Sequence, residues 1–598
     1  MQKNSPRFWT SSVDEKLSAS LAIDQFFEYE GVTILSGWAL RVDALRFFRL
    51  NGSPVPSPSM IRFRRTDVEE IYEISDAKVE GFIAIWPKSF GDDAVLISSE
   101  THAEFRLSLS LDDPQSSQKK AQQIVLEQRP RLGRIIHVLH DQPSWMVFCL
   151  PLIPSAGRFT KARAHIEQAR GLPQIGGVVV GWSVSPPPGA IFACSASGVL
   201  KPLAKAVRWN RQDITEAFEA DFGRIALNSG FMVTLQFDLR IEQEVKLIAI
   251  DGEEAFVLAT SSWSPAPQDP TSLARWMFGF PMSSRSFIER LSDQIYPIME
   301  TLLRQRRDAL RSVEAGVKSF GALAPEPVCS IIIPLYGRYD FIEHQMIEFA
   351  RDPFIRNQTE IIYVIDDPRI TDAVYDTCAL YSELYGLPLR IVDGHINRGF
   401  SGANNLGASF ARGRALLFLN SDVFPLKSGW LEKMLRALVQ AENVGVVGAR
   451  LLFHNGTLQH DGMSFEWNDA LGAHLNQHPQ AGMPPEATSK KATSRMAVTG
   501  ACMLLRAETY QGVGGFEEEF LIGDFEDSDL CLKIRASGKK ILCVEDVELV
   551  HLERQSFSGL GAASFSQLVV YYNLYKHEKR WGELIKAMLA GIQPGRKQ

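Results

Sequence analysis

Cysteine is scarce in this chain: the 598 residues include seven, widely spaced and never arranged as a C-x-x-C pair. This usage argues against a disulfide framework and against a structural zinc site. The formal net charge is only −7, so no overall attraction for nucleic acid or for an anionic membrane surface is present. We therefore expect a protein of a reducing, cytoplasmic compartment that has no nucleic-acid partner.

Long hydrophobic runs are also lacking. No stretch approaches the ~18 apolar residues of a membrane-spanning helix, and the N-terminus has no basic start leading into an apolar core. The longest apolar stretch, 145–154, is interpreted as a buried strand. With 45% hydrophobic and 22% charged residues, the composition is that of a globular protein and excludes disorder as the main state.

A pattern of glycine, aromatic and charged residues occurs twice in the N-terminal half. Gly37-Trp38 and Gly181-Trp182 are each followed, at nearly the same spacing, by an Arg-x-x-Arg-x-Asp segment and a Gly-Phe pair. The repeat predicts two copies of a β-sandwich module, at 20–115 and 170–262, joined by a mixed connector at 116–169. The tryptophans could stack on a sugar or belong to the module cores, and we favour the cores.

The pattern changes after a Pro-rich stretch. Apolar residues at helical spacing between 287 and 313 predict a helical linker, placed at 275–322, with Pro297 as a kink or boundary. Over 325–582, continuous apolar strands alternate with helices. This alternation predicts an α/β domain whose parallel sheet is covered on both faces.

Polar and acidic residues end three of the expected strands, in Pro334-Leu-Tyr336, Asp366-Asp367 and Asn420-Ser421-Asp422. Ligands of parallel sheets collect at the carboxyl ends of the strands. The chain has neither a G-x-x-x-x-G-K-[ST] loop nor a complete dinucleotide fingerprint, so a divalent metal on carboxylates is the expected way to hold phosphates. A site made of Asp422 and His551 would leave coordination positions open for a diphosphate.

In their order and spacing, these motifs resemble the inverting family 2 glycosyltransferases with the Rossmann-like GT-A fold. The resemblance covers roughly 328–580. It includes the opening strand 330–338, the strand 363–367 and an Asn/Gly-rich segment, 397–407, similar to the rhamnosyltransferase-like branch. Leu419-Asn-Ser-Asp422 stands in the place of the D-x-D motif, with Asn420 replacing its first acid. The acidic segment 524–530 resembles the motif that supplies the catalytic base.

The resemblance implies a role for each of these positions. Asp527 would be the base that deprotonates the acceptor hydroxyl, in a single displacement at the anomeric carbon. Asp422 and His551 would hold Mn²⁺ or Mg²⁺, and Asp367, in preference to Asp366, would read the donor base. The implied donor-binding residues are Pro334, Tyr336, Asp366, Asp367, Asn397, Gly399, Asn405, Asn420 and Ser421.

The resemblance also implies the reaction. A hexosyl or deoxyhexosyl group would pass from a UDP- or dTDP-linked nucleotide sugar to a glycan or lipid-linked acceptor, in cell-surface polysaccharide synthesis. A helix expected at 565–581 could touch the inner face of the membrane, where a lipid-linked acceptor lies, or could pack on the domain, which we favour. The β modules would position an acceptor glycan or a partner.

Each motif also has a structural interpretation. Asp366 and Asp367 could cap a helix, Asp527 could complement a helix dipole, His551 could be a hydrogen-bonded core residue, and segment 397–407 could be turn chemistry. Pro368 stands where a glycine is common in the family. The alternative function is a glycan-binding or scaffold protein with a catalytically silent GT-A domain. A sugar-phosphate nucleotidyltransferase is disfavoured, because no Gly-rich loop with Lys or Arg follows the first strand.

Overall fold

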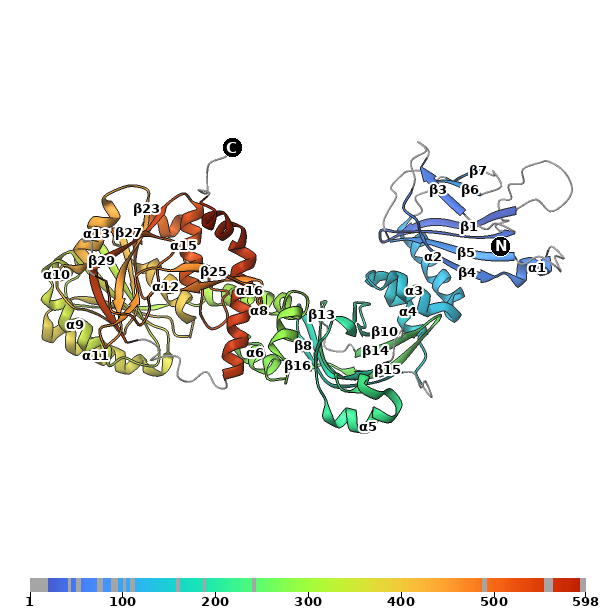
Figure 1. Ribbon diagram of the computed structural model, residues 1–598, viewed down its shortest axis with the longest axis horizontal. Coiled ribbons are helices and arrows are strands. Elements are labelled where there is room, and N and C mark those ends of the chain that lie inside the picture. Colours follow the sequence, from blue (N-terminus) through green and yellow to red (C-terminus); the bar gives the residue numbers. More distant parts are fainter. Residues whose placement is uncertain are drawn as a thin grey trace. The chain divides into compact units, whose positions relative to one another are not determined.

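The computed structural model describes residues 20–40, 45–49, 55–71, 79–87, 95–99, 104–107, 113–156, 162–185, 190–238, 244–486, 492–552 and 563–591. The chain divides into two compact units, residues 1–266 and 267–598 (Figure 1). The first unit consists of β-sheets with a helical segment between them. The second is an α/β unit.

The first unit begins with a pair of antiparallel sheets. The larger has the order β1-β2-β5-β4 (Ser20–Tyr29, Val32–Leu40, Val79–Trp86 and Ser59–Arg64), with helix α1 (Thr66–Ile71) between β4 and β5. The smaller has the order β3-β6-β7 (Leu45–Arg49, Val95–Ser99 and Glu104–Leu107). Phe47 of β3 packs against Leu35 and Trp86 in one buried cluster. The two sheets therefore share a core.

A second pair of sheets has the orders β12-β13-β9-β8-β16 and β11-β10-β14-β15. The first of these comprises Val207–Trp209, Gly230–Gln236, Gly176–Val184, Arg163–Leu172 and Ser264–Pro265. The second comprises Leu200–Pro202, Ala190–Ser195, Glu244–Asp251 and Glu254–Ser262, and helix α5 (Gln212–Phe222) joins β12 to β13. Val179, Phe231 and Leu247 meet in a cluster drawn from both sheets.

Several local features occur in both sheet pairs. The order β8-β9-β13-β12, with a helix before β13, matches β1-β2-β5-β4 with a helix before β5. A register shift follows Ile23 in β1 and Ile166 in β8. The expected boundary at 169/170 falls inside β8, so the second sheet pair begins earlier than the sequence indicated.

The repeated charged residues form ion pairs within each sheet pair. Arg65 contacts Asp24 at 2.7 Å and Asp67 at 2.8 Å. Arg211 contacts Glu167 at 2.8 Å and Asp213 at 2.6 Å.

The repeated tryptophans pack inside the protein. Trp38 is 9% exposed, and Trp182 is half-buried with its ring centroid 5.3 Å from that of Phe218. Packing therefore accounts for both tryptophans, as the core interpretation expects.

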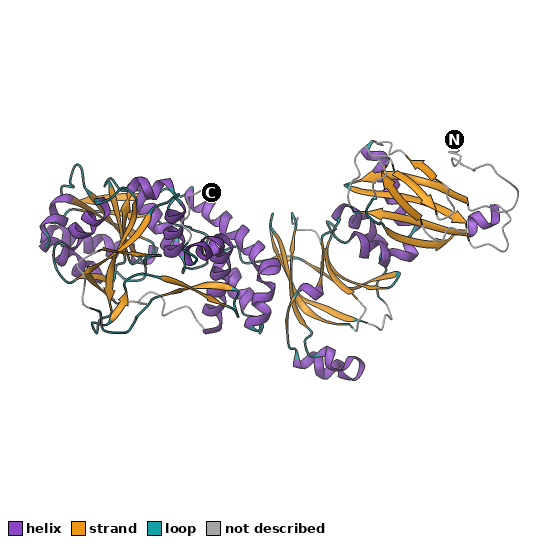
Figure 2. Cartoon of the chain, turned by 45° about the horizontal axis from the view of Figure 1, so that its top comes forward, coloured by secondary structure: helices purple, strands orange, loops and turns teal. Residues whose placement is uncertain are grey.

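The connector between the sheet pairs is helical, with α2 at Pro114–Glu127, α3 at Leu132–Leu139 and α4 at Pro143–Cys149 (Figure 2). The interpretation of 145–154 as a strand was wrong: the segment contains α4 and a 3-10 turn, Leu150–Leu152. Pro143 starts the helix, and Trp145, Met146 and Cys149 are buried at helical spacing. A short apolar run does not by itself distinguish a buried helix from a buried strand.

The connector helices fill the space between the two sheet pairs. One buried cluster joins them to Ile34 and Ile83 of the first pair and to Phe192 and Ile248 of the second. Successive side chains of a strand point to opposite faces. The neighbours of Phe192 and Ile248, Ala193 and Leu247, therefore face the core between the two sheets of the second pair. The β10-β14 sheet is thus buried on both sides.

The second unit starts with helices α6 (Pro270–Phe278), α7 (Ser284–Arg290) and α8 (Tyr296–Arg311), with a π-helical turn at Leu291–Ile295. Pro297 lies in the first turn of α8, where a missing backbone N–H costs nothing, so it marks a boundary. The predicted linker to residue 322 extends too far, because β17 (Gly316–Phe320) pairs with β20 and belongs to the main sheet.

The main sheet is mixed, in the order β17-β20-β19-β18-β21-β28-β23-β29-β22, with β24 beside β23 and β27 beside β29. Strands β18, β19, β20 and β21 are parallel, as the alternating pattern predicted, and β28 is antiparallel to both of its neighbours. After β17, in chain order, the strands are β18 Cys329–Leu335, β19 Thr359–Ile365, β20 Leu389–Asp393, β21 Ala415–Leu419, β22 Val423–Pro425, β23 Val444–Leu452, β24 Leu458–His460, β27 Ala492–Arg495, β28 Cys502–Arg506 and β29 Lys540–His551.

Helices cover both faces of this sheet. Ile331 and Ile333 of β18 join a cluster with α9, α11 and α13, whereas Ile332 joins one with α12, α15 and α16. A separate hairpin is formed by β25 (Ser464–Asn468) and β26 (Ala473–Gln477). The helices are α9 Phe341–Arg351, α10 Pro353–Gln358, α11 Thr371–Tyr385, α12 Gly399–Phe410, α13 Trp430–Val439, α14 Ala507–Gly512, α15 Glu526–Ala536 and α16 Ala563–Leu589.

The long helix α16 packs on the α/β unit. Phe565, Tyr572 and Leu574 are buried, and Trp581 donates from its indole nitrogen to Asp529 at 2.7 Å. These contacts match the packing interpretation of the aromatic residues at 565–581. Among the described helices, none combines the length and apolar character needed to cross a membrane.

Candidate active site

The carboxyl ends of β18 and β19 bring the first predicted donor residues to one edge. Pro334 lies opposite Val364 in the parallel register, and the Asp366 amide donates to the Leu335 carbonyl at 2.9 Å. Tyr336, directly after β18, is 40% exposed. Tyr336, Asp366 and Asp367 therefore lie at neighbouring strand ends.

The Asp367 carboxylate is bound by its own chain. It accepts from the Gly337 amide at 3.1 Å and from the Arg369 guanidinium at 2.8 and 2.7 Å. The Arg369 guanidinium, chiefly through these hydrogen bonds, holds the pKa of Asp367 below its ordinary value. Arg369 also lies 5.9 Å from the Tyr336 ring centroid, and its side chain is 74% exposed. The base of a nucleotide sugar could contact Asp367 only if the Arg369 side chain moved aside.

Asp366 anchors the turn that starts α12. It is 4% exposed and accepts from the Arg398 amide at 2.6 Å. Burial raises the pKa of Asp366 to about 7, although backbone hydrogen bonds from Arg398 and Gly399 oppose the rise. The Asn397 side chain accepts from the Gly399 amide at 2.9 Å, and Gly399 has a left-handed φ of 73°. This geometry matches the turn interpretation of the segment.

Asn405 holds a different loop. Its amide nitrogen donates to the Phe516 carbonyl at 3.0 Å and to Glu518 at 2.6 Å. Its oxygen accepts from the Phe516 amide at 3.0 Å and from the Tyr510 hydroxyl. All hydrogen-bonding positions of the Asn405 side chain are therefore in use within the chain. Asn405 therefore fixes the loop 514–518 in this structure, and its role in donor binding stays a prediction.

Asp422 and His551, far apart in the sequence, are brought together by strand pairing. Val423 lies opposite His551 where β22 pairs with β29. The His551 Nε2 atom is 3.3 Å from the Asp422 Oδ1 atom, and Asp422 is 9% exposed. Asn420 and Ser421 are half-buried just before it. The Asn420 backbone is held by Gln345, which donates to its carbonyl at 3.0 Å.

Gln459 orients the His551 ring. Its side-chain oxygen lies 2.7 Å from His551 Nδ1, and its nitrogen donates to the His551 carbonyl at 3.2 Å. An amide oxygen only accepts, so the Nδ1 atom carries a hydrogen and Nε2 is the ring nitrogen that faces Asp422 and could bind a metal. Nothing in the sequence distinguishes Gln459, and sequence reasoning missed it.

One carboxylate oxygen and one imidazole nitrogen suit Mn²⁺ or Mg²⁺ as a partial donor set. In the part of the chain that the structure describes, no group of three or more His, Cys, Asp or Glu side chains gathers to hold a metal. The residues therefore fit a divalent cation that takes its remaining ligands from a diphosphate and from water.

The Gln459→Leu substitution is expected to weaken Mn²⁺ affinity by about 10- to 100-fold, because the imidazole loses the contact that sets its tautomer. The measurement is calorimetric titration of Mn²⁺ in the presence of a nucleoside diphosphate. Gln440→Leu, at an exposed position, is the matched control. Unchanged Mn²⁺ affinity in the Gln459 variant would contradict the orienting role.

Asp527 is the second residue of α15 and faces the turn before β28. Its carboxylate accepts from the Gly500 amide at 3.1 Å and from the Ser528 amide at 2.7 Å. Burial raises the pKa of Asp527 above its ordinary value, and these two hydrogen bonds oppose the rise. A carboxylate with a raised pKa is a better proton acceptor, so this environment suits a general base.

Two histidines that sequence reasoning missed connect the neighbourhoods of Asp527 and His551. His460 follows Gln459, is 2% exposed, and accepts at Nε2 from the Thr499 amide at 3.2 Å. Burial holds the pKa of His460 well below its ordinary value, so the ring is neutral and carries its hydrogen on Nδ1. The His460 Nδ1 atom donates this hydrogen to the Nδ1 atom of His478, and the two nitrogen atoms are 3.0 Å apart. Thr499, whose amide binds His460, in turn forms a side-chain hydrogen bond to Asp527 that lowers the pKa of this carboxyl.

The backbone just before α15 is strained. Ile522, Asp524 and Phe525 have positive φ angles of 65°, 93° and 71°, a region that side-chain-bearing residues rarely adopt. Asn573 of α16 holds the segment, accepting from the Leu521 amide at 2.9 Å and donating to the Gly523 carbonyl at 2.7 Å. Helix α16 therefore supports the conformation in which Glu526 and Asp527 begin their helix.

Glu526 is expected to make stability depend on pH. Burial, and next the charge of Asp527, raise its pKa from 4.5 to about 8. Between these values the unfolded chain is ionised while the folded chain keeps the proton, so folding stability falls as pH rises, by at most about 1.4 kcal/mol per pH unit. In denaturant titrations, Glu526→Gln should gain stability relative to the unchanged protein from about pH 5 to about pH 8.

The matched control for that experiment is Glu466→Gln, at an exposed position of the hairpin. Its stability difference from the unchanged protein should not vary over the same pH range. A Glu526→Gln difference that is equally flat would show that this carboxyl is ionised in the folded protein.

Comparison with known proteins gives the class of the α/β unit. The family described as "Glycosyl transferase family 2" matches residues 330–511. These residues carry β18 to β21, β28, the predicted donor positions and Asp422. The chain thus contains a family 2 glycosyltransferase domain at residues 330–511.

Two curated relatives share part of the sequence. The O-antigen biosynthesis protein RfbC of Myxococcus xanthus is 33% identical over 154 residues, which cover 26% of this chain and 12% of RfbC. The uncharacterized protein y4gI of Sinorhizobium fredii (strain NBRC 101917 / NGR234) is 30% identical over 243 residues, 40% of this chain and 26% of y4gI. The matches therefore span about an eighth and about a quarter of these relatives.

Among solved structures, GalNAc-T7 with UDP, GalNAc and Mn²⁺ is 15% identical with a TM-score of 0.33, covering 45% of this chain and 55% of that one. The mannosyltransferase PcManGT of Pyrobaculum calidifontis, with GDP-Man and Mn²⁺, is 16% identical with a TM-score of 0.29, covering 52% and 88%.

Proposed function

We propose that the chain is an inverting glycosyltransferase. It transfers a hexosyl or deoxyhexosyl group from a UDP- or dTDP-linked nucleotide sugar to a hydroxyl of a glycan or lipid-linked acceptor. The observation that carries the proposal is a series of contacts that runs from Asp422 through His551 and Gln459 to His460, and from His460 through Thr499 to Asp527. It supports a partial cation site and a half-buried carboxylate with a raised pKa in one neighbourhood of the domain.

In this mechanism, Asp527 accepts the proton of the acceptor hydroxyl. The hydroxyl oxygen forms a bond to the anomeric carbon while the bond from that carbon to the diphosphate oxygen breaks, and the nucleoside diphosphate leaves with the bonding electrons. Attack from the opposite face inverts the anomeric configuration. A divalent cation held by Asp422 and His551 would supply positive charge for the leaving diphosphate. The Gly500 and Ser528 amides hold the Asp527 carboxylate in place.

The printed name of RfbC supports a role in surface-polysaccharide synthesis. For such a role we place the protein in the cytoplasm, at the inner face of the membrane where a lipid-linked acceptor would lie. We further propose that the two sheet pairs of the first unit are copies of one β-sandwich module, supported by their matching strand order, register shifts and Arg–acid pairs. These modules would position the acceptor glycan or a partner.

A second candidate function is glycan binding by a chain whose GT-A domain does not turn over. Two observations favour it. Asn420 stands where the resemblance expects an acid, and the Arg369 guanidinium binds the Asp367 carboxylate. Such a protein would bind glycan through residues 20–262 and leave nucleotide sugars intact.

The test is a panel of UDP-, dTDP- and GDP-linked sugars incubated with the purified chain and Mn²⁺ or Mg²⁺. Binding and release of nucleoside diphosphate are both measured, with and without a chelator. Release of nucleoside diphosphate from one donor, lost when a chelator is added, would support the transferase and identify the nucleotide base of its donor. If no donor bound with either metal, the transferase proposal would be wrong, and glycan binding by residues 20–262 would be tested next.

A further inference from the structure

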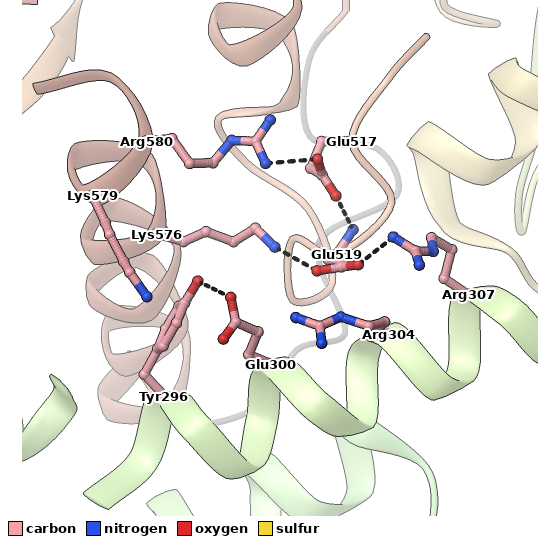
Figure 3. A pocket seen from close by; sticks show the side chains of 9 residues that line it. All are labelled: Tyr296, Glu300, Arg304, Arg307, Glu517, Glu519, Lys576, Lys579 and Arg580. Carbon is pink, nitrogen blue, oxygen red and sulfur yellow. Dashed lines mark hydrogen bonds and ion pairs between the residues drawn. The ribbon is translucent and has the colours of Figure 1, made fainter. Parts of the chain in front are cut away.

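A charged pocket of about 390 Å³ lies between α8, α16 and the loop residues 517–519 (Figure 3). It contains none of the residues assigned above to donor, metal or base. Apart from Tyr296, its lining consists of charged side chains: the cations Arg304, Arg307, Lys576, Lys579 and Arg580, and the acids Glu300, Glu517 and Glu519. Cations therefore outnumber acids.

The acids of this pocket already have partners. In Figure 3, Arg307 and Lys576 point at Glu519 from opposite sides, at 2.5 and 3.1 Å. Glu517 pairs with Arg580 at 2.8 Å, and the Tyr296 hydroxyl donates to Glu300 at 2.6 Å. Outside the lining, Asp308 pairs with Arg307 and Asp529 with Arg580, each at 2.8 Å, so the surplus positive charge of the pocket lies on the lining cations that have no carboxylate partner.

Arg304 and Lys579 carry that surplus. Within the described residues, neither makes an ion pair with a carboxylate. The Lys579 ammonium lies 4.4 Å from the Tyr296 ring centroid, and Arg304 points into the pocket (Figure 3). Behind them Lys576 is only 2% exposed, so its charge acts where water screens it little. A concave surface with surplus positive charge raises the local concentration of anions.

The types of cation indicate which anion fits. Guanidinium groups bind phosphate oxygens through paired N–H donors, and ammonium groups add charge without a fixed direction. The pocket offers both types from two facing helices. We propose that it binds a phosphate or diphosphate group, which Arg304 and Lys579 contact first. The site does not depend on the proposed transfer reaction.

Two sources could supply this group: a soluble phosphate compound, or the headgroup of a lipid diphosphate. The experiment uses the full chain in a chelating buffer, so that Asp422 and His551 cannot hold the anion through a metal. Inorganic pyrophosphate is titrated by calorimetry. In parallel, the chain is sedimented with phosphatidylcholine vesicles that contain or lack a polyprenyl diphosphate, with and without added pyrophosphate.

Arg304→Ala and Lys579→Ala are each expected to weaken pyrophosphate binding about tenfold, the effect of losing one charge-assisted contact. Both residues are exposed and outside the ion pairs, so folding should be retained, and a thermal melt verifies this. The matched control is Arg311→Ala, an exposed arginine of α8 that does not line the pocket.

Vesicle binding that needs the lipid diphosphate and is displaced by pyrophosphate would assign the site to a lipid headgroup. Pyrophosphate binding without vesicle binding would assign it to a soluble compound. The proposal is overturned if neither probe binds, if the two pocket variants bind as well as the unchanged chain, or if Arg311→Ala loses as much affinity as they do.

Discussion

The Asp527→Asn variant is expected to lose sugar transfer by about a hundred- to ten-thousand-fold, the usual contribution of a positioned general base. Asparagine keeps the shape of the side chain, although its single oxygen can accept from only one of the Gly500 and Ser528 amides, so a thermal melt must verify that the variant stays folded. It cannot take a proton from the acceptor hydroxyl. Transfer is measured as product formed per time at saturating donor and acceptor.

Binding of the nucleoside diphosphate should remain unchanged in this variant, because Asp527 does not hold the donor. The matched control is Asp524→Asn, an exposed acid of the same motif at a positive φ that asparagine tolerates. Comparable transfer by the Asp527 variant and the unchanged chain would refute the assignment of the base.

The Asp422→Ala variant is expected to lose the metal-dependent part of nucleotide affinity. With Mn²⁺ present, its affinity for the nucleoside diphosphate should fall to the value that the unchanged chain shows with a chelator. The reason is that the partial site keeps only the His551 nitrogen, and one neutral ligand holds a divalent cation weakly. Calorimetric titration of UDP and dTDP with Mn²⁺ and with EDTA measures the difference.

His551→Ala should give the same result, since either ligand alone is insufficient. His454→Ala, at an exposed histidine outside the site, is the matched control. If the Asp422 variant retained a full difference between the Mn²⁺ and EDTA titrations, the cation would have to bind elsewhere.

The sequence was sufficient to predict the α/β unit. Continuous apolar strands such as 329–335 and 359–365 have no polar face, so they require cover on both sides, and the structure has β18 and β19 buried in that way. Parallel strand ends meet at one edge, so the proximity of Tyr336 and Asp366 also followed from the pattern.

Local sequence patterns were less reliable where a helix and a strand would bury the same residues. The apolar stretch 145–154 has no marked periodicity, and only the packing of α4 between the sheet pairs decided for a helix. The contacts of Asn405 could not be predicted for a related reason. Its position in an Asn/Gly-rich segment resembled a donor loop, but the loop at Phe516, far along the chain, uses all of its hydrogen bonds.

By itself, the sequence determined the class of the α/β unit, the strand ends that carry acids and the candidate pair Asp422 and His551. These depend on hydrophobic periodicity and on residue order, which are local properties of the chain. The tertiary structure decided the roles of Gln459, His460 and His478, the pairing of Arg369 with Asp367, and the charged pocket between α8 and α16. These depend on contacts between distant segments, which have no periodic signature because folding, not spacing, brings their side chains together.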